Sequence, residues 1–325
     1  MRAPKFWRHR TLGAYVLTPL SSVWSISGLI KNFFVREWHS PVPIICVGNL
    51  IAGGAGKTPV AIAISEKLTK NGAEPHLLSR GYGGSLRGPI KVNIHSHLFR
   101  EVGDEPLILA QKTPTWVSKN RAAGAQAAIK DGASIIVMDD GYQNKSLSKT
   151  LSILVFDGEI GMGNRMVMPA GPLRETIKSG KVRADAIIII GKDQSGIEKN
   201  FQGINPIVHA KIVAVPDTKI INKNVFAFSG IGYPEKFYKT LREIGCKIVE
   251  KKIFKDHHPF KDGEIKMICD RATILNAVPV TTEKDFMRLP LEARKIIHPL
   301  RIRLEWETES DLDLLLKKVA PNGAI

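Results

Sequence analysis

From Pro41 onward, short aliphatic runs alternate with stretches of helical character. The runs are apolar at consecutive positions, which predicts strands that are buried on both faces of a parallel sheet. The predicted strands are 42–47, 76–79, 134–138, 152–156 and 186–190, and the predicted helices include 58–70 and 121–130. Strands that alternate with helices predict an α/β fold with a mostly parallel sheet and helices on both faces.

A second series of elements follows the polar stretch TKIINKN at 218–224. Its predicted strands are 225–228, 247–254 and 278–281, and its predicted helices are 234–244 and 261–275. We place a boundary near residue 218. Residues 41–217 are then expected to form the main domain, and residues 218–325 a smaller C-terminal α/β lobe.

The first forty residues have a different pattern. Residues 11–30 carry no charge, but their Ser, Thr, Gly and Pro content is poor for a bilayer centre, which disfavours a membrane span or a cleaved signal. Aromatic residues are interleaved here with basic ones: Trp7, Tyr15, Trp24, Phe33 and Phe34 with Arg2, Lys5, Arg8 and Arg10. We predict that residues 1–40 form an amphipathic helix in the headgroup region of a membrane; a helix packed on its own domain is the alternative.

The amino-acid composition indicates which classes of binding partner the protein favours. The 325 residues include 47 Lys and Arg against 31 Asp and Glu, a formal charge of +16, which favours nucleic acid, anionic lipid or phosphorylated small molecules. The three cysteines lack the spacing of a zinc site or a disulfide framework, which indicates a reducing, cytoplasmic setting.

A glycine-rich loop follows the first predicted strand and opens a helix. The strict phosphate-loop pattern that ends at Gly56-Lys57-Thr58 would place glycine where this chain has Ile51. Backbone N–H groups at the remaining glycines can still surround an anion, Lys57 supplies a charge for the β and γ phosphates, and Thr58 a hydroxyl for Mg²⁺. The predicted phosphate-binding residues are Ile51, Ala52, Gly53, Gly54, Ala55, Gly56, Lys57 and Thr58. A glycine-rich turn without a ligand is the alternative.

An acidic pair ends another predicted strand, in IIVMDDGYQN at 135–144. Apolar residues followed by Asp139 and Asp140 match a Walker B strand, whose carboxylate holds Mg²⁺ directly or through water. Such a strand end is also common as a turn or helix cap. Together with the glycine loop it predicts a site for a nucleoside triphosphate and Mg²⁺, and either aspartate could be the ligand.

Transfer of a phosphoryl group to an alcohol needs a group that accepts the hydroxyl proton. Two clusters offer one, GDEP at 103–106 and DHHP at 256–259, although each could instead be a helix cap or a surface turn. SRGYGG at 79–84 could contact an anionic substrate or form a plain turn. PAGPLRE at 169–175 has no assignment from its chemistry alone.

Taken together, these segments resemble the tetraacyldisaccharide 4'-kinase family, the lipid A 4'-kinases of Gram-negative bacteria. The matching stretches, in family order from residue 47 to 285, are VGNLIAGGAGKTP, SRGYGG, VGDEP, DDGYQN, GNRMVMPAGPLRE, FSGIGYPEKF, DHHPF and TTEKD. The family's loop usually lacks glycine at the position of Ile51, so that departure fits. Tyr142, Asn144 and Thr176 depart from the usual Phe, His and Pro, and none of them removes a group assigned to chemistry.

The resemblance implies transfer of the γ-phosphate of ATP, with Mg²⁺, to the 4'-hydroxyl of a tetraacyl disaccharide 1-phosphate. It implies a catalytic pair of Asp104 and a histidine of DHH, which we assign to His257 rather than His258, with Lys57 at the phosphates. It also implies that Thr58, Asp139, Asp140, Gln143 and Glu175 surround the metal and phosphates.

The resemblance further implies a peripheral protein at the cytoplasmic face of the bacterial inner membrane, which agrees with the charge of +16 and the uncharged N-terminal segment. We expect a monomer that meets an anionic membrane surface and binds no nucleic acid.

Two other classes are less favoured. A P-loop GTPase or metallocentre chaperone would carry N-K-x-D, and the nearest string, Thr282-Glu283-Lys284-Asp285, has the wrong spacing. A basic nucleic-acid-binding ATPase would interleave aromatic with basic residues, but aromatic residues are sparse beyond the N-terminal segment.

Overall fold

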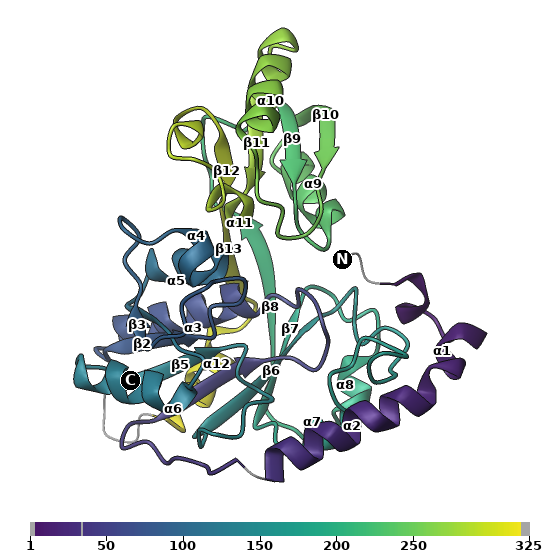
Figure 1. The fold of residues 1–325 in the computed structure, drawn as a ribbon, viewed down its shortest axis with the longest axis vertical. Coiled ribbons are helices and arrows are strands. Elements are labelled where there is room, and N and C mark those ends of the chain that lie inside the picture. The colour runs from purple at the N-terminus through teal and green to yellow at the C-terminus, as the bar shows by residue number, and fades with distance from the viewer. Residues whose placement is uncertain (1–3, 34, 320–325) are drawn as a thin grey trace.

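The computed structural model describes residues 4–33 and 35–319 and contains two sheets, one in each lobe (Figure 1). The large sheet has nine strands in the order β13-β8-β7-β6-β1-β5-β2-β4-β3. Its strands are β1 (Ile44–Gly48), β2 (Pro75–Ser79), β3 (Ile90–Lys91), β4 (Thr115–Val117), β5 (Ile135–Asp139), β6 (Leu151–Asp157), β7 (Ala186–Ile190), β8 (Ile207–Ala214) and β13 (Ile302–Trp306). Neighbours are parallel except at the two edges, where β3 and β13 are antiparallel. The predicted α/β fold is therefore confirmed.

The glycine-rich loop leaves the centre of this sheet. β1 pairs with β5 on one side and with β6 on the other, and Val47 of β1 lies opposite Asp139 of β5. The carboxyl ends of β1 and β5 therefore lie side by side. Ligands of open parallel sheets bind at this edge, where the strand order reverses.

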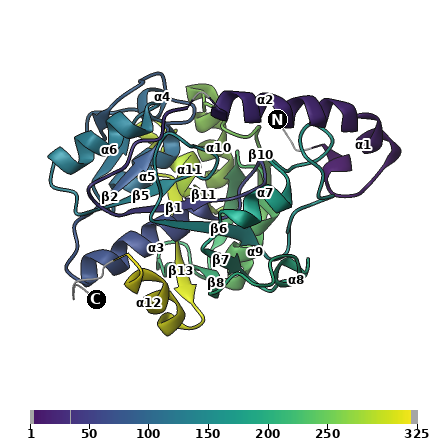
Figure 2. The same cartoon turned by 90° about the horizontal axis from the view of Figure 1, so that it is seen from below.

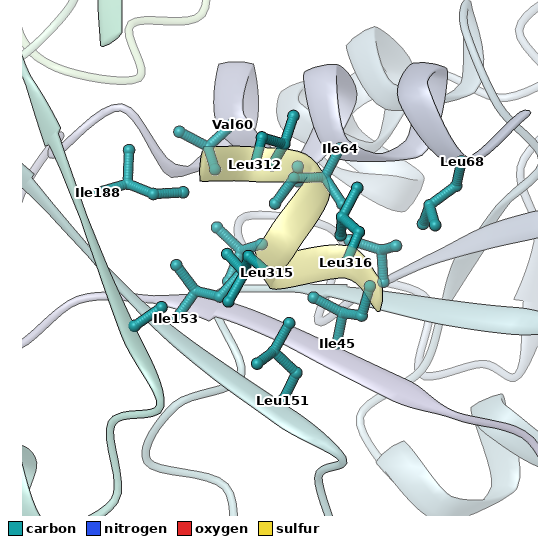
Figure 3. Packing of buried hydrophobic residues seen from close by; sticks show 14 of the residues in the cluster. Ile45, Val60, Ile64, Leu68, Leu151, Ile153, Ile188, Leu312, Leu315 and Leu316 are labelled. Carbon is teal, nitrogen blue, oxygen red and sulfur yellow. The ribbon is translucent and has the colours of Figure 1, made fainter. Parts of the chain in front are cut away.

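Helices cover both faces of the large sheet (Figure 2). They are α3 (Lys57–Lys70), α4 (Phe99–Val102), α5 (Asp104–Ala110), α6 (Arg121–Lys130), α7 (Ile177–Val182), α8 (Ile197–Asn200) and α12 (Glu309–Lys317). On one face, leucines of α12 and apolar residues of α3 pack on Ile45, Leu151, Ile153 and Ile188 (Figure 3). On the other face, Ala125 and Ala128 of α6 belong to a second buried cluster.

The second lobe has a parallel sheet in the order β10-β9-β11-β12. Its elements are β9 (Asn224–Ser229), α9 (Pro234–Glu243), β10 (Lys247–Ile253), α10 (Asp262–Ile274), β11 (Val278–Thr282), α11 (Glu283–Phe286), a 3-10 turn (Ala293–Lys295) and β12 (His298–Leu300). α9 packs on one face through Phe237, Tyr238 and Leu241, and α10 on the other through Ile265 and Ile268.

The C-terminal segment returns to the large sheet. The chain leaves that sheet after β8 and enters the small one at β9, close to the predicted boundary at 218. However, β13 pairs with β8, and α12 packs on α3. The prediction of one lobe over 218–325 therefore differs from the structure, since residues 302–317 belong with the first sheet. The reason is that β13 is a half-buried edge strand, for which the sequence predicted no element.

The N-terminal segment forms a 3-10 turn (Lys5–Trp7), α1 (Leu12–Val16) and α2 (Thr18–Phe33), which lie along one side of the first lobe (Figures 1 and 2). Ser21 Oγ donates to the Val167 carbonyl at 2.7 Å, and Trp24 Nε1 donates to the Arg174 carbonyl at 3.2 Å. In the part of the chain that is described, no helix is both long and apolar enough to span a bilayer. Arg2 and Phe34, counted above among the interleaved residues, lie outside the described residues.

Candidate active site

The glycine-rich loop joins β1 to α3 and requires glycine at its base. Gly56, just before α3, has φ of 82°, and a Cβ there would lie 2.3 Å from Ile190 Cδ1. Gly53 and Gly54 are exposed at the loop tip, whereas Ile51 and Ala55 are buried. The glycines can thus offer backbone N–H groups to an anion, while the side chains of Ile51 and Ala55 belong to the core.

The absence of glycine at residue 51 has a structural reason. Ile51 is 2% exposed and forms a bridge with Leu173, and Ala52 N–H donates to the Pro172 carbonyl at 2.8 Å. The backbone at residues 51 and 52 therefore fastens the phosphate loop to the segment 169–175, and the Ile51 side chain fills a buried cluster that also contains Leu173. The sequence had given that segment no role from its own chemistry.

Asp139 is a buried carboxylate with too few partners. Its Oδ2 accepts a hydrogen bond from Thr58 Oγ1 at 3.0 Å, while Oδ1 has no partner among the described residues. Burial, together with the negative charge of Glu105, raises the pKa of Asp139 to about 7. A cation beside Thr58 and Asp139 would compensate this buried charge.

Asp140 differs from its neighbour because cations already surround it. Arg174 Nη1 and Nη2 donate to its two oxygens at 2.7 and 3.1 Å, and Lys57 Nζ lies 3.6 Å from Oδ1. Burial works against ionisation, but the charges of Lys57 and Arg174 outweigh it and lower the pKa of Asp140 to about 2. Asp140 therefore holds these two cations at the phosphate loop.

Gln143 and Glu175 continue this network on the side of the 169–175 segment. Gln143 Nε2 donates to the Asn49 carbonyl at 2.9 Å and to Glu175 Oε1 at 3.1 Å. Glu175 also pairs with Arg183 and accepts from Ser179 Oγ at 2.9 Å. Within residues 4–33 and 35–319, no three His, Cys, Asp or Glu side chains are arranged to hold a metal alone. A metal here would therefore need oxygens from a nucleotide or water as well.

Asp104 begins α5 and lies beneath the second lobe. It is 3% exposed, its Oδ1 accepts from Glu105 N–H at 3.0 Å, and its Oδ2 accepts from Arg288 Nε at 2.9 Å. His257 Nδ1 lies 3.3 Å from the same Oδ2. Burial works against ionisation, but the hydrogen bond from His257 and the charge of Arg288 hold the pKa of Asp104 well below its ordinary value.

The structure distinguishes the two adjacent histidines. His257 adopts φ of 56°, and its ring points to Asp104, whose hydrogen bond raises the pKa of His257 despite partial burial. His258 turns the other way: Nε2 lies 2.8 Å from Glu264 Oε2, and its ring stacks on Phe254 at 4.7 Å. The pair that the geometry brings together is therefore Asp104 and His257.

The SRGYGG segment lies beside Asp104. A Cβ at Gly103 would come within 2.6 Å of the Tyr82 carbonyl, and one at Gly84 within 2.5 Å of the Glu101 carbonyl. Tyr82 and Arg80 are exposed there, and the Tyr82 ring lies 5.5 Å from that of His257. Their side chains are available to an acceptor that approaches Asp104.

Two cations of this site were missed in the sequence. Arg288 contacts Asp104, and Lys284 pairs with Glu105, so two basic residues four positions apart meet two consecutive acids. The available signal was TTEKD, which had contributed to the family resemblance and to the rejection of guanine recognition, and which contains Lys284 but not Arg288. The contacts join Lys284 to Glu105, 179 positions apart, and Arg288 to Asp104, 184 positions apart, so neither segment alone could reveal them.

The two lobes also meet at a second place, beside the phosphate loop. Lys236 of α9 pairs with Asp157, and Lys239 Nζ lies 3.2 Å from Glu159 Oε1. A Cβ at Gly53 would lie 3.8 Å from Tyr233 Cε2. The second lobe therefore contacts the first beside the phosphate loop and at Asp104.

Known proteins of one family are similar to this chain over nearly its whole length. The family model described as tetraacyldisaccharide-1-P 4'-kinase matches residues 13–320. The tetraacyldisaccharide 4'-kinase of Rhodospirillum centenum is 45% identical over 97% of this chain and 96% of its own length. That of Paramagnetospirillum magneticum is 43% identical over 98% and 99%. A crystal structure of LpxK from Aquifex aeolicus in complex with ATP has a TM-score of 0.73 at 26% identity, covering 94% of this chain and 99% of that one.

Proposed function

The chain belongs to the tetraacyldisaccharide-1-P 4'-kinase family, and from this premise we propose a mechanism in which its two lobes each supply half of the phosphoryl-transfer site. The protein is an ATP-binding kinase of lipid A biosynthesis that phosphorylates the 4'-hydroxyl of its lipid disaccharide. A P-loop GTPase or metallocentre chaperone is not favoured. The observation that carries the proposal is the meeting of Asp104 and His257 across the lobes.

ATP binds at the loop between β1 and α3. Backbone N–H groups of residues 53–56 and the N-terminus of α3, a helix of 14 residues, face the phosphates, and Lys57 adds its charge. Lys57 Nζ lies 3.6 Å from Asp140 Oδ1, beyond ordinary hydrogen-bond length, so it can turn to the phosphates without losing a tight pair. Asp140, whose carboxylate is fixed by Arg174, keeps it near the transferring group.

The residues present fit Mg²⁺ completed by nucleotide oxygens. Thr58 Oγ1 and the unpartnered Oδ1 of Asp139 would hold the ion, and both are hard oxygen donors. Asp140, Gln143 and Glu175 complete the surroundings through the network described above. When bound, Mg²⁺ neutralises charge that develops on the β and γ phosphate oxygens.

Asp104 and His257 handle the proton of the sugar hydroxyl. A carboxylate with a lowered pKa is a weak base by itself. Asp104 therefore orients the hydroxyl, and the proton that the hydroxyl loses is shared between Asp104 and His257, whose pKa Asp104 raises. Because His257 belongs to the second lobe, the pair is complete only when the lobes meet. Closure would also exclude water from the γ-phosphate.

The lipid substrate requires access to a membrane, and α1 and α2 offer the surface for it. Their exposed apolar side chains are Leu12, Tyr15, Val16, Leu20, Val23, Trp24, Ile26 and Ile30. Together with the chain's formal charge of +16, this surface favours peripheral binding to an anionic membrane. We propose that the protein binds there as a monomer, at the cytoplasmic face, where ATP is present. Serine at Leu20, Val23 and Ile30 should reduce co-sedimentation with anionic vesicles; undiminished binding would contradict this surface.

The experiment for the catalytic pair uses purified protein, γ-labelled ATP, Mg²⁺ and the tetraacyl disaccharide 1-phosphate in mixed micelles. Asp104→Ala should abolish labelling of the lipid. Asp131→Asn, which removes an exposed carboxylate paired with Lys91, is the matched control and should retain activity. Full activity in Asp104→Ala would exclude the role of Asp104, and absence of labelled lipid with the wild-type protein would exclude the reaction.

A further inference from the structure

Arg288 links the two lobes at the catalytic pair. The residue follows α11 in the second lobe, and its side chain is 1% exposed. Nε donates to Asp104 Oδ2 at 2.9 Å, and Nη2 donates to the same oxygen. Nη1 donates to Asp285 Oδ1 at 2.9 Å and to the Gly230 carbonyl at 3.1 Å. Since all three nitrogens are engaged, the guanidinium has one fixed orientation.

The second lobe holds this guanidinium from behind. Asp285 is fully buried, and its Oδ2 accepts from Gly230 N–H at 3.0 Å and from Thr282 Oγ1 at 2.7 Å. The Gly230 carbonyl also accepts the backbone N–H of His257 at 3.1 Å. Arg288 and His257 are therefore fastened to the same point of the second lobe and reach Asp104 together.

Arg288 also competes for the ring nitrogen that faces Asp104. Its Nη2 lies 3.2 Å from His257 Nδ1, and that Nδ1 lies 3.3 Å from Asp104 Oδ2. A protonated Nδ1 donates to Asp104, whereas an unprotonated Nδ1 accepts from Arg288. The charge of Arg288 favours ionised Asp104 and disfavours protonated His257.

We propose that Arg288 is a positioning residue, which fixes Asp104 Oδ2 and makes the Asp104–His257 pair give up its proton at a lower pH than the pair would without it. The inference rests on the proposed role of that pair. The other charged groups around it are Lys284 and Glu105, which neutralise each other, the buried Asp285, and Asp256, whose Oδ1 is 3.9 Å from His257 Nε2. Tyr82, whose ring lies 5.5 Å from that of His257, is a further titratable neighbour. Of these groups, Arg288 is the cation in contact with both members of the pair.

The test compares Arg288→Gln with Arg288→Lys across pH. The Gln variant loses the charge, so the acid limb of kcat/KM should move upward by about one pH unit, with a fall in kcat of about 10²-fold. The Lys variant keeps the charge but not the three-nitrogen geometry, so its limb should stay in place while kcat falls about 10-fold. The KM for ATP should not change in either variant.

Arg294→Gln is the matched control. Arg294 is a half-buried arginine of the same lobe that donates to the carbonyls of Leu289 and Met287 and, among residues 4–33 and 35–319, pairs with no carboxylate. In Arg294→Gln the acid limb of kcat/KM should stay at the wild-type pH, whatever the substitution does to the stability of the protein. A limb that stays at the wild-type pH in Arg288→Gln would overturn the proposal, as would a limb that moves equally in Arg288→Lys.

A second measurement does not depend on turnover. The imidazole resonance of His257, identified by its absence in His257→Gln, should titrate at higher pH in Arg288→Gln than in the wild type. If the Gln variant does not fold, Arg288→Lys decides, since a wild-type kcat there contradicts a positioning role. Full activity in Asp104→Ala would contradict the proposed role of the pair. An inactive Asp104→Ala, together with an acid limb of kcat/KM that stays at the wild-type pH in Arg288→Gln, would contradict only the role of Arg288.

Discussion

The phosphate-binding end of the site lies within one lobe, whereas the proton-accepting end exists only where two lobes meet. Thr58 lies at the start of α3, directly after the loop that leaves β1, and Asp139 ends the adjacent strand β5, so the first lobe alone brings them together. Asp104 and His257 are brought together by Arg288, Lys284 and the packing of α11 on α5. The first end is thus preorganised in the core, and the second depends on closure.

The largest effect is expected from a substitution in the phosphate loop. Lys57→Met removes the charge beside the phosphates, and in a preorganised site this should lower kcat by about 10³-fold. Because the loop belongs to one lobe, Asp104 and His257 should be undisturbed, and the titration of His257 should match that of the wild type. Labelled-lipid assays and the His257 resonance check this, and a displaced titration would contradict the independence of the two ends.

The proton-accepting end should respond to His257 and not to its neighbour. His257→Gln is expected to lower kcat by about 10²-fold, the contribution of a positioned proton acceptor. His258→Gln removes an imidazole that faces Glu264 and Phe254, so its kcat should stay near that of the wild type. Equal losses in both variants would mean that the effect comes from the loop and not from the pair.

The difference between the two ends also explains what the sequence could predict. The central strands and α3 were found within a few residues because their apolar runs and glycine loop are local signals. β8 and β13 were missed because, beside and at the edge of the sheet, most of their residues are only partly buried and polar residues interrupt their apolar runs. Asp104 and His257 were assigned from the family resemblance. Arg288 could not be found because its partners are set by lobe packing, which no local pattern records.

Backbone strain offers a smaller effect that separates folding from catalysis. Gly56→Ala places a Cβ 2.3 Å from Ile190 Cδ1 at φ of 82°, so the free energy of unfolding should fall by about 2–4 kcal/mol. Gly72→Ala has φ of 83° with no atom within 4 Å of the Cβ, so it should lose only about 1 kcal/mol, the cost of the conformation alone. Denaturant unfolding measures both. Equal losses would show that the loop base is not closely packed on β7.

The smallest expected effect is the pH dependence of stability at the lobe contact. The pKa of His257 is raised above its ordinary value of 6.5 by Asp104, so the stability it contributes is fully present below that value. This stability is lost as pH rises through the folded pKa. Since the His257 side chain is 37% exposed, screening should hold the contribution below about 1 kcal/mol.

Asp104 contributes in the opposite direction, because its pKa is lowered below the ordinary value of 3.8. The stability that Asp104 contributes therefore persists above pH 3.8 and is lost only in strong acid. Between these limits His257 dominates the pH dependence of this contact. Wild type and His257→Gln, unfolded by urea at pH 5.5 and pH 8.5, should therefore differ in free energy of unfolding more at the lower pH. A difference that grows toward the higher pH would mean that folding lowers the pKa of His257, so that the unprotonated ring facing Arg288, and not the ion pair with Asp104, stabilises the lobe contact.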